Sequence, residues 1–114
     1  MAHQYMKRVI TAFSLCLLLY LFGGDLLAQS APTATTGAAT GVGSTTATLN
    51  GTVNANGAST TTYFEYGLDT SYGNIWTADQ SPVTGSTNTA VTATPGELLP
   101  DTTYHYRVAA QNAY

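Results

Sequence analysis

The stretch "LLPDTTYHYRVAAQNAY", residues 98–114, joins a proline-containing turn to a segment in which apolar and polar side chains alternate. Such alternation predicts a strand with one face in a hydrophobic core, because successive side chains of a strand point to opposite sides. The expected inward side chains are Tyr104, Tyr106, Val108 and Ala110, and the expected outward ones are His105, Arg107, Ala109 and Gln111. A strand of this kind belongs in the middle of a sheet.

Upstream of this strand, shorter segments show the same alternation between turns that contain glycine or proline. The expected inward residues are Ala47, Leu49, Gly51 and Val53, then Thr62, Phe64 and Tyr66, then Val91 and Ala93. A further short strand is expected at residues 74–78, and no segment after residue 30 has a helical period. Short alternating strands with such turns are typical of two stacked sheets. We therefore predict an all-β, antiparallel β-sandwich.

The first 28 residues have the order of a secretory signal peptide. Lys7 and Arg8 precede an apolar run at residues 9–22, and small residues follow up to Ala28. We predict a signal-peptide helix at residues 1–28, a linker with a weak first strand at 29–43, and the sandwich at 44–114. The alternative is a retained membrane anchor, although two glycines and an aspartate cut the run short of the ~20 residues that a span needs.

The composition limits both the stabilising chemistry and the partners. The only cysteine, Cys16, lies within the predicted leader, so the exported chain is expected to fold without disulfides. Among the three basic residues, Arg107 is the only one beyond position 8. Because phosphate binding needs several Lys or Arg side chains on one face, this distribution argues against nucleic-acid partners. We expect no membrane contact once the leader is cleaved.

Three stretches carry a resemblance to a known family: "ATLNGTVNANG" (47–57), "YFEYGLDTSYG" (63–73) and "LLPDTTYHYRVAAQNA" (98–113). Together they resemble the fibronectin type III-like modules of secreted bacterial proteins, over about residues 32–114. The most specific part is a Leu-x-Pro-x-Thr-x-Tyr pattern formed by Leu98, Pro100, Thr102 and Tyr104. The resemblance implies a fibronectin type III or immunoglobulin-like sandwich and a bacterial source.

The resemblance also implies structural roles in the last strand and the turn before it. Pro100 sets the backbone angle where the chain crosses between sheets, and Leu98 covers the end of the core. The Tyr104 hydroxyl is expected to bond back to the backbone near Leu98, as in a tyrosine corner. Tyr106 stands where disulfide-linked immunoglobulin domains have a cysteine, which favours the fibronectin type.

The family's module has a seventh strand, which would pair with the strand that ends here near Gln111, whereas the sequence stops at Tyr114. Two explanations are open. Either the chain is a fragment of a longer protein, or a partner donates the strand, as in the donor-strand complementation of pilin subunits. An unprotected central edge is an aggregation hazard, which favours the fragment. The expected fold is therefore a sandwich truncated before its final strand.

No motif for catalysis, a cofactor or a metal is recognisable, so we expect no catalytic residue, no cofactor and no metal site. In the family's topology the outward Tyr63 and Glu65 lie beside the outward His105 and Arg107 of the neighbouring strand. Glu65 and Arg107 then form an ordinary cross-strand ion pair. Alternatively, the four residues form a shallow surface that binds sugar or protein.

Trp76 is a further candidate for this binding surface, and Tyr72 lies in the same predicted loop. The two aromatic side chains would form a sugar-stacking platform, or they would cover the open end of the core. The second role is the more common one for such residues.

These features predict a non-catalytic β-sandwich module that acts as a spacer, adhesion or display unit of a secreted or cell-surface protein, with the periplasm as another destination. Its partners would be the other domains of that protein, and a polysaccharide or cell-surface protein. The alternative is a carbohydrate-binding module attached to a secreted glycoside hydrolase. A third hypothesis is a subunit that a partner's strand completes.

Overall fold

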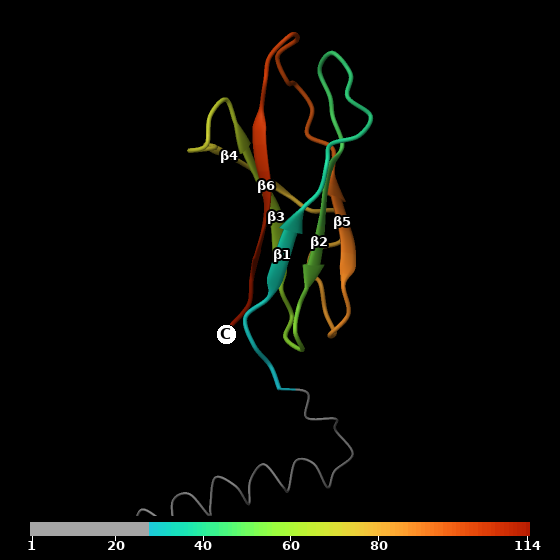
Figure 1. The fold of residues 1–114 in the computed structure, drawn as a ribbon, viewed down its shortest axis with the longest axis vertical. Coiled ribbons are helices and arrows are strands. Elements are labelled where there is room, and N and C mark those ends of the chain that lie inside the picture. The colour runs from blue at the N-terminus through green and yellow to red at the C-terminus, as the bar shows by residue number, and fades with distance from the viewer. Residues whose placement is uncertain (1–27) are drawn as a thin grey trace, which may run out of the picture.

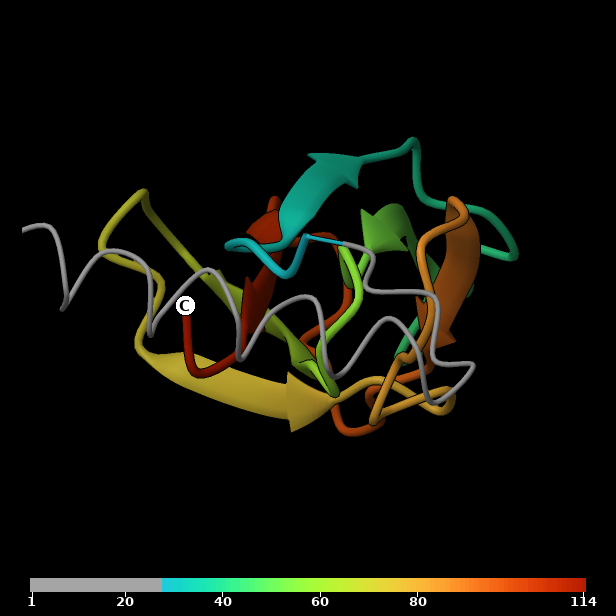
Figure 2. The same ribbon diagram turned by 90° about the horizontal axis from the view of Figure 1, so that it is seen from below.

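The computed structural model describes residues 28–114, which form two antiparallel sheets of three strands each (Figure 1). The strand order in one sheet is β1 (Thr33–Thr36), β2 (Leu49–Asn54) and β5 (Thr89–Ala93). In the other it is β4 (Asn74–Thr77), β3 (Thr61–Gly67) and β6 (His105–Gln111). The end-on view shows β1 and β5 in one layer and β4 in the other (Figure 2). The predicted all-β class with antiparallel sheets is confirmed.

The signal-peptide prediction falls on residues 1–27, which lie outside the described residues. The weak first strand expected within 29–43 is present as β1, and the short strand expected at 74–78 is present as β4. From residue 28 onward, the structure contains no helix with the length and the apolar character needed to cross a membrane.

The core lies between the central strands β2 and β3, and it is built from the alternate residues that the sequence pattern predicts. Val53, Phe64 and Val91 have 0% of their surface exposed, and Tyr106 and Ala110 pack against the core from β6. The inward faces predicted for β2, β3, β5 and β6 are therefore confirmed. The apolar core residues are Leu49, Val53, Ala55, Phe64, Ala78, Val83, Val91, Ala93 and Val108.

Gly51 lets the two sheets approach closely. It lies on the inward face of β2, and a β-carbon placed there would come within 2.9 Å of Val108 Cβ on β6. No side chain larger than hydrogen fits at this separation without a shift of the opposing strand. The inward glycine in an otherwise apolar face is thus a packing requirement.

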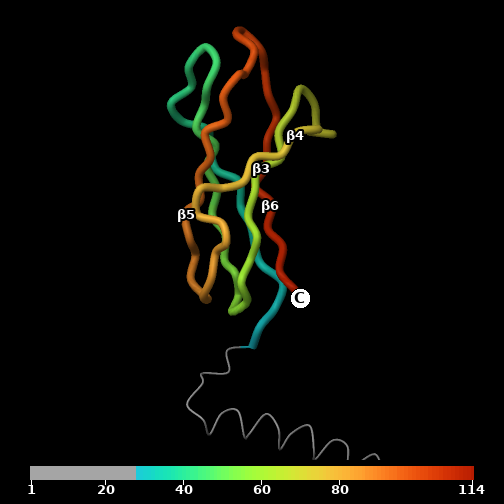
Figure 3. Tube along the Cα trace, turned by 180° about the vertical axis from the view of Figure 1, so that it is seen from behind, coloured from blue at the N-terminus to red at the C-terminus, as the bar shows by residue number. Residues whose placement is uncertain are grey.

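The two ends of the sandwich are built differently (Figures 1 and 3). At one end, which we call the base, Asn112 Nδ2 donates hydrogen bonds to the backbone oxygens of Ser30 (2.9 Å) and Ala55 (3.2 Å). Gln29 Nε2 donates to Gly57 O at 3.1 Å in the same region. The opposite end, the distal pole, consists of the loops at residues 37–46 and 95–104. The first and last described residues therefore lie together at the base.

Candidate functional site

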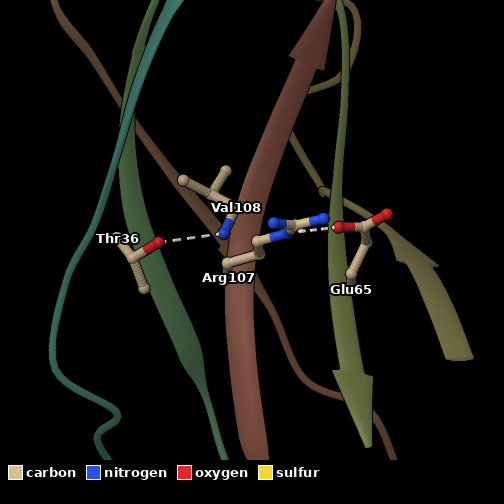
Figure 4. A network of polar contacts seen from close by, with 4 residues as sticks. All are labelled: Thr36, Glu65, Arg107 and Val108. Atoms are coloured by element: carbon tan, nitrogen blue, oxygen red, sulfur yellow. Dashed lines mark hydrogen bonds and ion pairs between the residues drawn. The ribbon is translucent and has the colours of Figure 1, made fainter. Parts of the chain in front are cut away.

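The outer face of the β4–β3–β6 sheet, which is the side away from the core, carries four of the predicted surface residues. Glu65 lies directly across from Arg107, and His105 lies across from Gly67 two residue pairs further along. Arg107 Nε donates to Glu65 Oε2 at 2.5 Å (Figure 4), and this bond raises the pKa of the guanidinium. The predicted cross-strand pair is therefore present.

Arg107 also contacts an aromatic ring that the sequence analysis did not assign to it. Its Cζ lies 4.7 Å from the centre of the Tyr72 ring, and Tyr72 reaches this position from the β3–β4 loop with a φ of 60°. A guanidinium at this distance is attracted to the negative face of the ring. The single cation of the described residues is thus engaged twice within the chain, which leaves the outer face with little charge to offer a ligand.

Trp76 does not join the other four candidates on the outer face. It pairs with Phe64, and residues paired across neighbouring strands point to the same side of a sheet. Phe64 is fully buried in the core, so Trp76 projects to the core side at the edge strand β4, where 41% of its surface is exposed. Since Tyr72 lies against Arg107, Trp76 and Tyr72 face opposite sides of the sheet. A platform made of these two rings, which was the less common of the two roles considered for them, is therefore not formed.

The turn before β6 contains the hydrogen bond expected of a tyrosine corner. Tyr104 Oη accepts a hydrogen bond from the Leu99 N–H at 3.0 Å, and Thr102 Oγ1 donates to Pro100 O at 2.9 Å. The Leu98 N–H donates to Thr45 O at 2.9 Å. The Leu98 side chain is half-buried and lines a pocket together with the core residue Leu49.

The pocket opens at the distal pole between the loops at residues 37–46 and 95–104, with a volume of about 470 Å³. Its walls are mainly apolar, and the rings of Tyr66 and Tyr104 stand 6.5 Å apart in them. The other main wall residues are Val42, Leu49, Leu98 and Tyr106. This size and lining are typical of small-ligand sites. Sequence reasoning missed the pocket, although the apolar Val42, Leu98 and Leu99 in polar loops were a signal.

The side of β6 that faces away from β3 is covered only by parts of the N-terminal segment. The Val108 N–H donates to Thr36 Oγ1 at 3.1 Å (Figure 4), and the Tyr106 hydroxyl donates to Gly37 O. Burial raises the pKa of the Tyr106 phenol. All four residues of β1 are nevertheless exposed. β1 and β6 are thus in contact but do not form a ladder of backbone hydrogen bonds.

Within residues 28–114, no three His, Cys, Asp or Glu side chains gather in a way that would hold a metal ion. Comparison with known proteins yields no relative: no family model, no curated protein and no solved structure matches the chain. The geometry of the pocket, the outer face and the β6 edge is therefore the basis for a functional proposal.

Proposed function

We propose that this chain is a non-catalytic, fibronectin type III-like module of an exported protein, which acts as a spacer, adhesion or display unit. The observation that carries the proposal is the polarity of the fold. The hydrogen bonds of Asn112 and Gln29 close the base, whereas the distal pole holds the apolar pocket between two long loops. Loops on a rigid sandwich are the usual carriers of binding.

This polarity favours adhesion or display over a plain spacer. Residue 28 and the C-terminus both lie towards the base, so a link to a neighbouring domain through either end leaves the distal pole pointing away from that domain (Figure 1). A module attached in this way presents its distal pole to the surroundings. Its partners would be the other domains of a larger secreted protein on one side, and a polysaccharide or surface protein on the other.

An orientation experiment tests the proposal, because residues 28–114 contain no cysteine. Ser59→Cys places a thiol on an exposed residue of the β2–β3 turn at the base. Gly96→Cys places one at the distal pole, where a β-carbon meets no atom within 4 Å. Each protein is coupled to beads through its thiol, and bead retention is measured on a panel of purified polysaccharides and proteins.

Beads coupled through position 59 are expected to be retained on at least one surface of the panel, and beads coupled through position 96 are not. Equal retention by the two orientations would show that the distal pole is not the binding end. Absence of retention on every surface by both would leave a spacer as the better description and overturn the adhesion role.

The second candidate function is a carbohydrate-binding module that accompanies a secreted glycoside hydrolase. The exposed face of Trp76 on the edge strand favours it, because sugar rings stack on such aromatic surfaces. Retention of Trp76→Ala and Tyr63→Ala proteins on polysaccharides tests this function, with Ile75→Ala as the matched control. Ile75 is 66% exposed and adjacent to Trp76, but it faces the other side of β4. Selective loss in Trp76→Ala would establish sugar binding, and equal behaviour of all three variants would exclude it.

A further inference from the structure

The pocket at the distal pole keeps apolar side chains in contact with solvent. Val42 and Leu99 line it from the two opposing loops, and 73% and 59% of their surfaces are exposed. The core residue Leu49 lines it as well, so the cavity extends from the surface to the core. Apolar side chains gathered around a concave surface of about 470 Å³ are typical of a site for a small molecule.

Two tyrosine rings in the pocket wall can attract a positive charge. The centres of the Tyr66 and Tyr104 rings are 6.5 Å apart, and the ring planes are tilted by 52°. Because of this tilt, the two rings do not cover each other as parallel stacked rings would. The face of a tyrosine ring attracts cations, and the same chain shows this contact between Arg107 and Tyr72 at 4.7 Å.

Asp101 is the one charged residue that lines the pocket, and its carboxylate is free to meet a ligand. It makes no ion pair or hydrogen bond with residues 28–114. The hydroxyl groups of three other lining residues already make hydrogen bonds to the backbone; these are Thr102, Tyr104 and Tyr106.

The charge of the fold also favours a cation. Among residues 28–114 the single basic residue is Arg107, which is bonded to Glu65 on the outer face. Glu97 is exposed in the same loop as Asp101, so the distal pole carries two carboxylates and no basic side chain of the described residues lines the pocket. A negative surface of this kind attracts cations and repels anions.

From these observations we infer that the pocket binds a small organic cation, in which one ammonium group is attached to an apolar body. The apolar body lies against the side chains of Leu49 and Leu98. The ammonium group lies beside the Asp101 carboxylate, within reach of the tyrosine rings. This inference goes beyond the proposed display function, because it assigns a small-molecule ligand to the pocket whether or not the module adheres to a surface.

Three other ligand classes fit the pocket less well. A carboxylate or phosphate would meet Asp101 and no basic side chain. A sugar carries hydroxyl groups around its ring, and those buried against the mainly apolar walls would lose hydrogen bonds to water without replacement. A bare metal ion needs several oxygen ligands, whereas a single carboxylate lines the pocket. An apolar body with one positive charge satisfies both the walls and the carboxylate.

The experiment compares four small probes on the purified protein by NMR titration of the backbone amides. Phenethylamine has the proposed chemistry. Phenethyl alcohol has the same apolar body without a charge, phenylacetate has a negative charge in its place, and glucose is the sugar probe. The amides of Leu98 and Leu99 report on the pocket, and the amide of Ser59 reports on the base.

Phenethylamine is expected to shift the amides of Leu98 and Leu99 and to leave that of Ser59 unchanged. Phenethyl alcohol is expected to bind about tenfold more weakly, because it lacks the attraction to the carboxylate and the ring faces. About 1 M salt should weaken the binding of the amine and not of the alcohol, since salt screens the charge.

Equal affinity for the amine and the alcohol would overturn the inference, because the pocket would then be an apolar site without a preference for charge. Tighter binding of glucose or phenylacetate than of the amine would overturn it in favour of another ligand class. Absence of amine binding, or amine shifts confined to residues outside the pocket, would also contradict it.

Two matched variants test the role of the carboxylate. Asp101 has a φ of 51°, and asparagine adopts this left-handed region as well as aspartate does, so Asp101→Asn removes the charge and keeps the backbone. It is expected to weaken amine binding by about five- to tenfold and to leave alcohol binding unchanged. Asp79→Asn makes the same change in net charge outside the pocket and is expected to leave both unchanged. Equal effects of the two variants on amine binding would contradict the assignment to Asp101.

The cation site and the proposed function fail separately. Retention of beads coupled at position 59, without any amine binding, would leave the display function standing and remove the cation site. Amine binding with no bead retention on any surface would have the opposite meaning.

Discussion

β3 and β6 are adjacent strands of equal length in one sheet, and they differ in what lies on their two sides. Both contain seven residues. β3 pairs with β4 on one side and with β6 on the other, and its Phe64 is fully buried. β6 pairs with β3 alone among the described strands, and its Tyr106 and Ala110 are half-buried. The same alternation therefore accompanies a central strand and an edge strand.

The difference separates two properties of a strand. Side chains stand perpendicular to the sheet, so their alternation determines which face is buried. Hydrogen bonds lie in the plane of the sheet, so the alternation carries no information on whether the backbone groups are paired. The apolar face of β6 is buried against the core, whereas the backbone groups on its outer edge are not paired in a ladder of hydrogen bonds. Four predictions test this comparison.

The largest effect is expected from the core of the central strand. Phe64→Ala should lower the free energy of unfolding by about 3–5 kcal/mol, because it removes a fully buried ring between the two sheets. Val108→Ala at the paired position of β6 should cost less, about 1.5–3 kcal/mol. Urea unfolding of the purified proteins measures both. A cost at Val108 that matches the cost at Phe64 would remove the distinction between the two strands.

The two edges of β6 are compared directly by proline substitutions at neighbouring positions. Ala109 pairs with Tyr63 and directs its N–H towards β3, so Ala109→Pro should cost about 1–3 kcal/mol through the carbonyl that it leaves unpaired. Ala110 directs its N–H away from β3, where no strand of residues 28–114 accepts it, so Ala110→Pro should cost less than about 1 kcal/mol. Thermal melting of the two variants gives the comparison. The reverse order of stabilities would show that the edge assignment is wrong.

Much of the fold was predictable from the sequence because a strand's side-chain period is two. The inward positions from Leu49 to Val108 follow from this period alone. The inward Gly51 fits the pattern as well, although only the 2.9 Å approach of Val108 explains why no larger residue stands there. The turns between the strands were predictable as well, because the glycine and proline residues that mark them are local features of the sequence.

The candidate site was predictable only in part, because its geometry depends on which segments become neighbours. The Glu65–Arg107 pair followed from an assumed strand order. The contact between Tyr72 and Arg107 did not, since it requires a left-handed backbone at Tyr72. The pocket joins loops about fifty residues apart in the sequence, and Trp76 was separated from the outer face by its pairing with Phe64. No local pattern specifies such contacts.

A smaller effect is expected at the start of β6, where the chain crosses from the other sheet. Tyr104→Phe should lower the free energy of unfolding by about 1 kcal/mol, because the Leu99 N–H loses its acceptor. The ring of Phe retains the packing against Tyr66, so the loss isolates the hydroxyl. Thermal melting measures the change. An unaltered melting temperature would mean that water replaces the hydroxyl and that the turn does not depend on it.

The smallest effect is expected on the outer face that β3 and β6 share. Glu65→Gln keeps a hydrogen-bond acceptor for Arg107 and leaves the Tyr72 ring in place, while it removes the carboxylate charge. Ion pairs between exposed side chains are weak because water and salt screen them. The urea midpoint is therefore expected to stay unchanged at physiological salt, with a small decrease at low salt. A loss of unfolding free energy as large as that of Tyr104→Phe would show that the ion pair aligns β6 against β3. The position of the edge strand would then depend on the charged outer face as well as on the core and the backbone ladder.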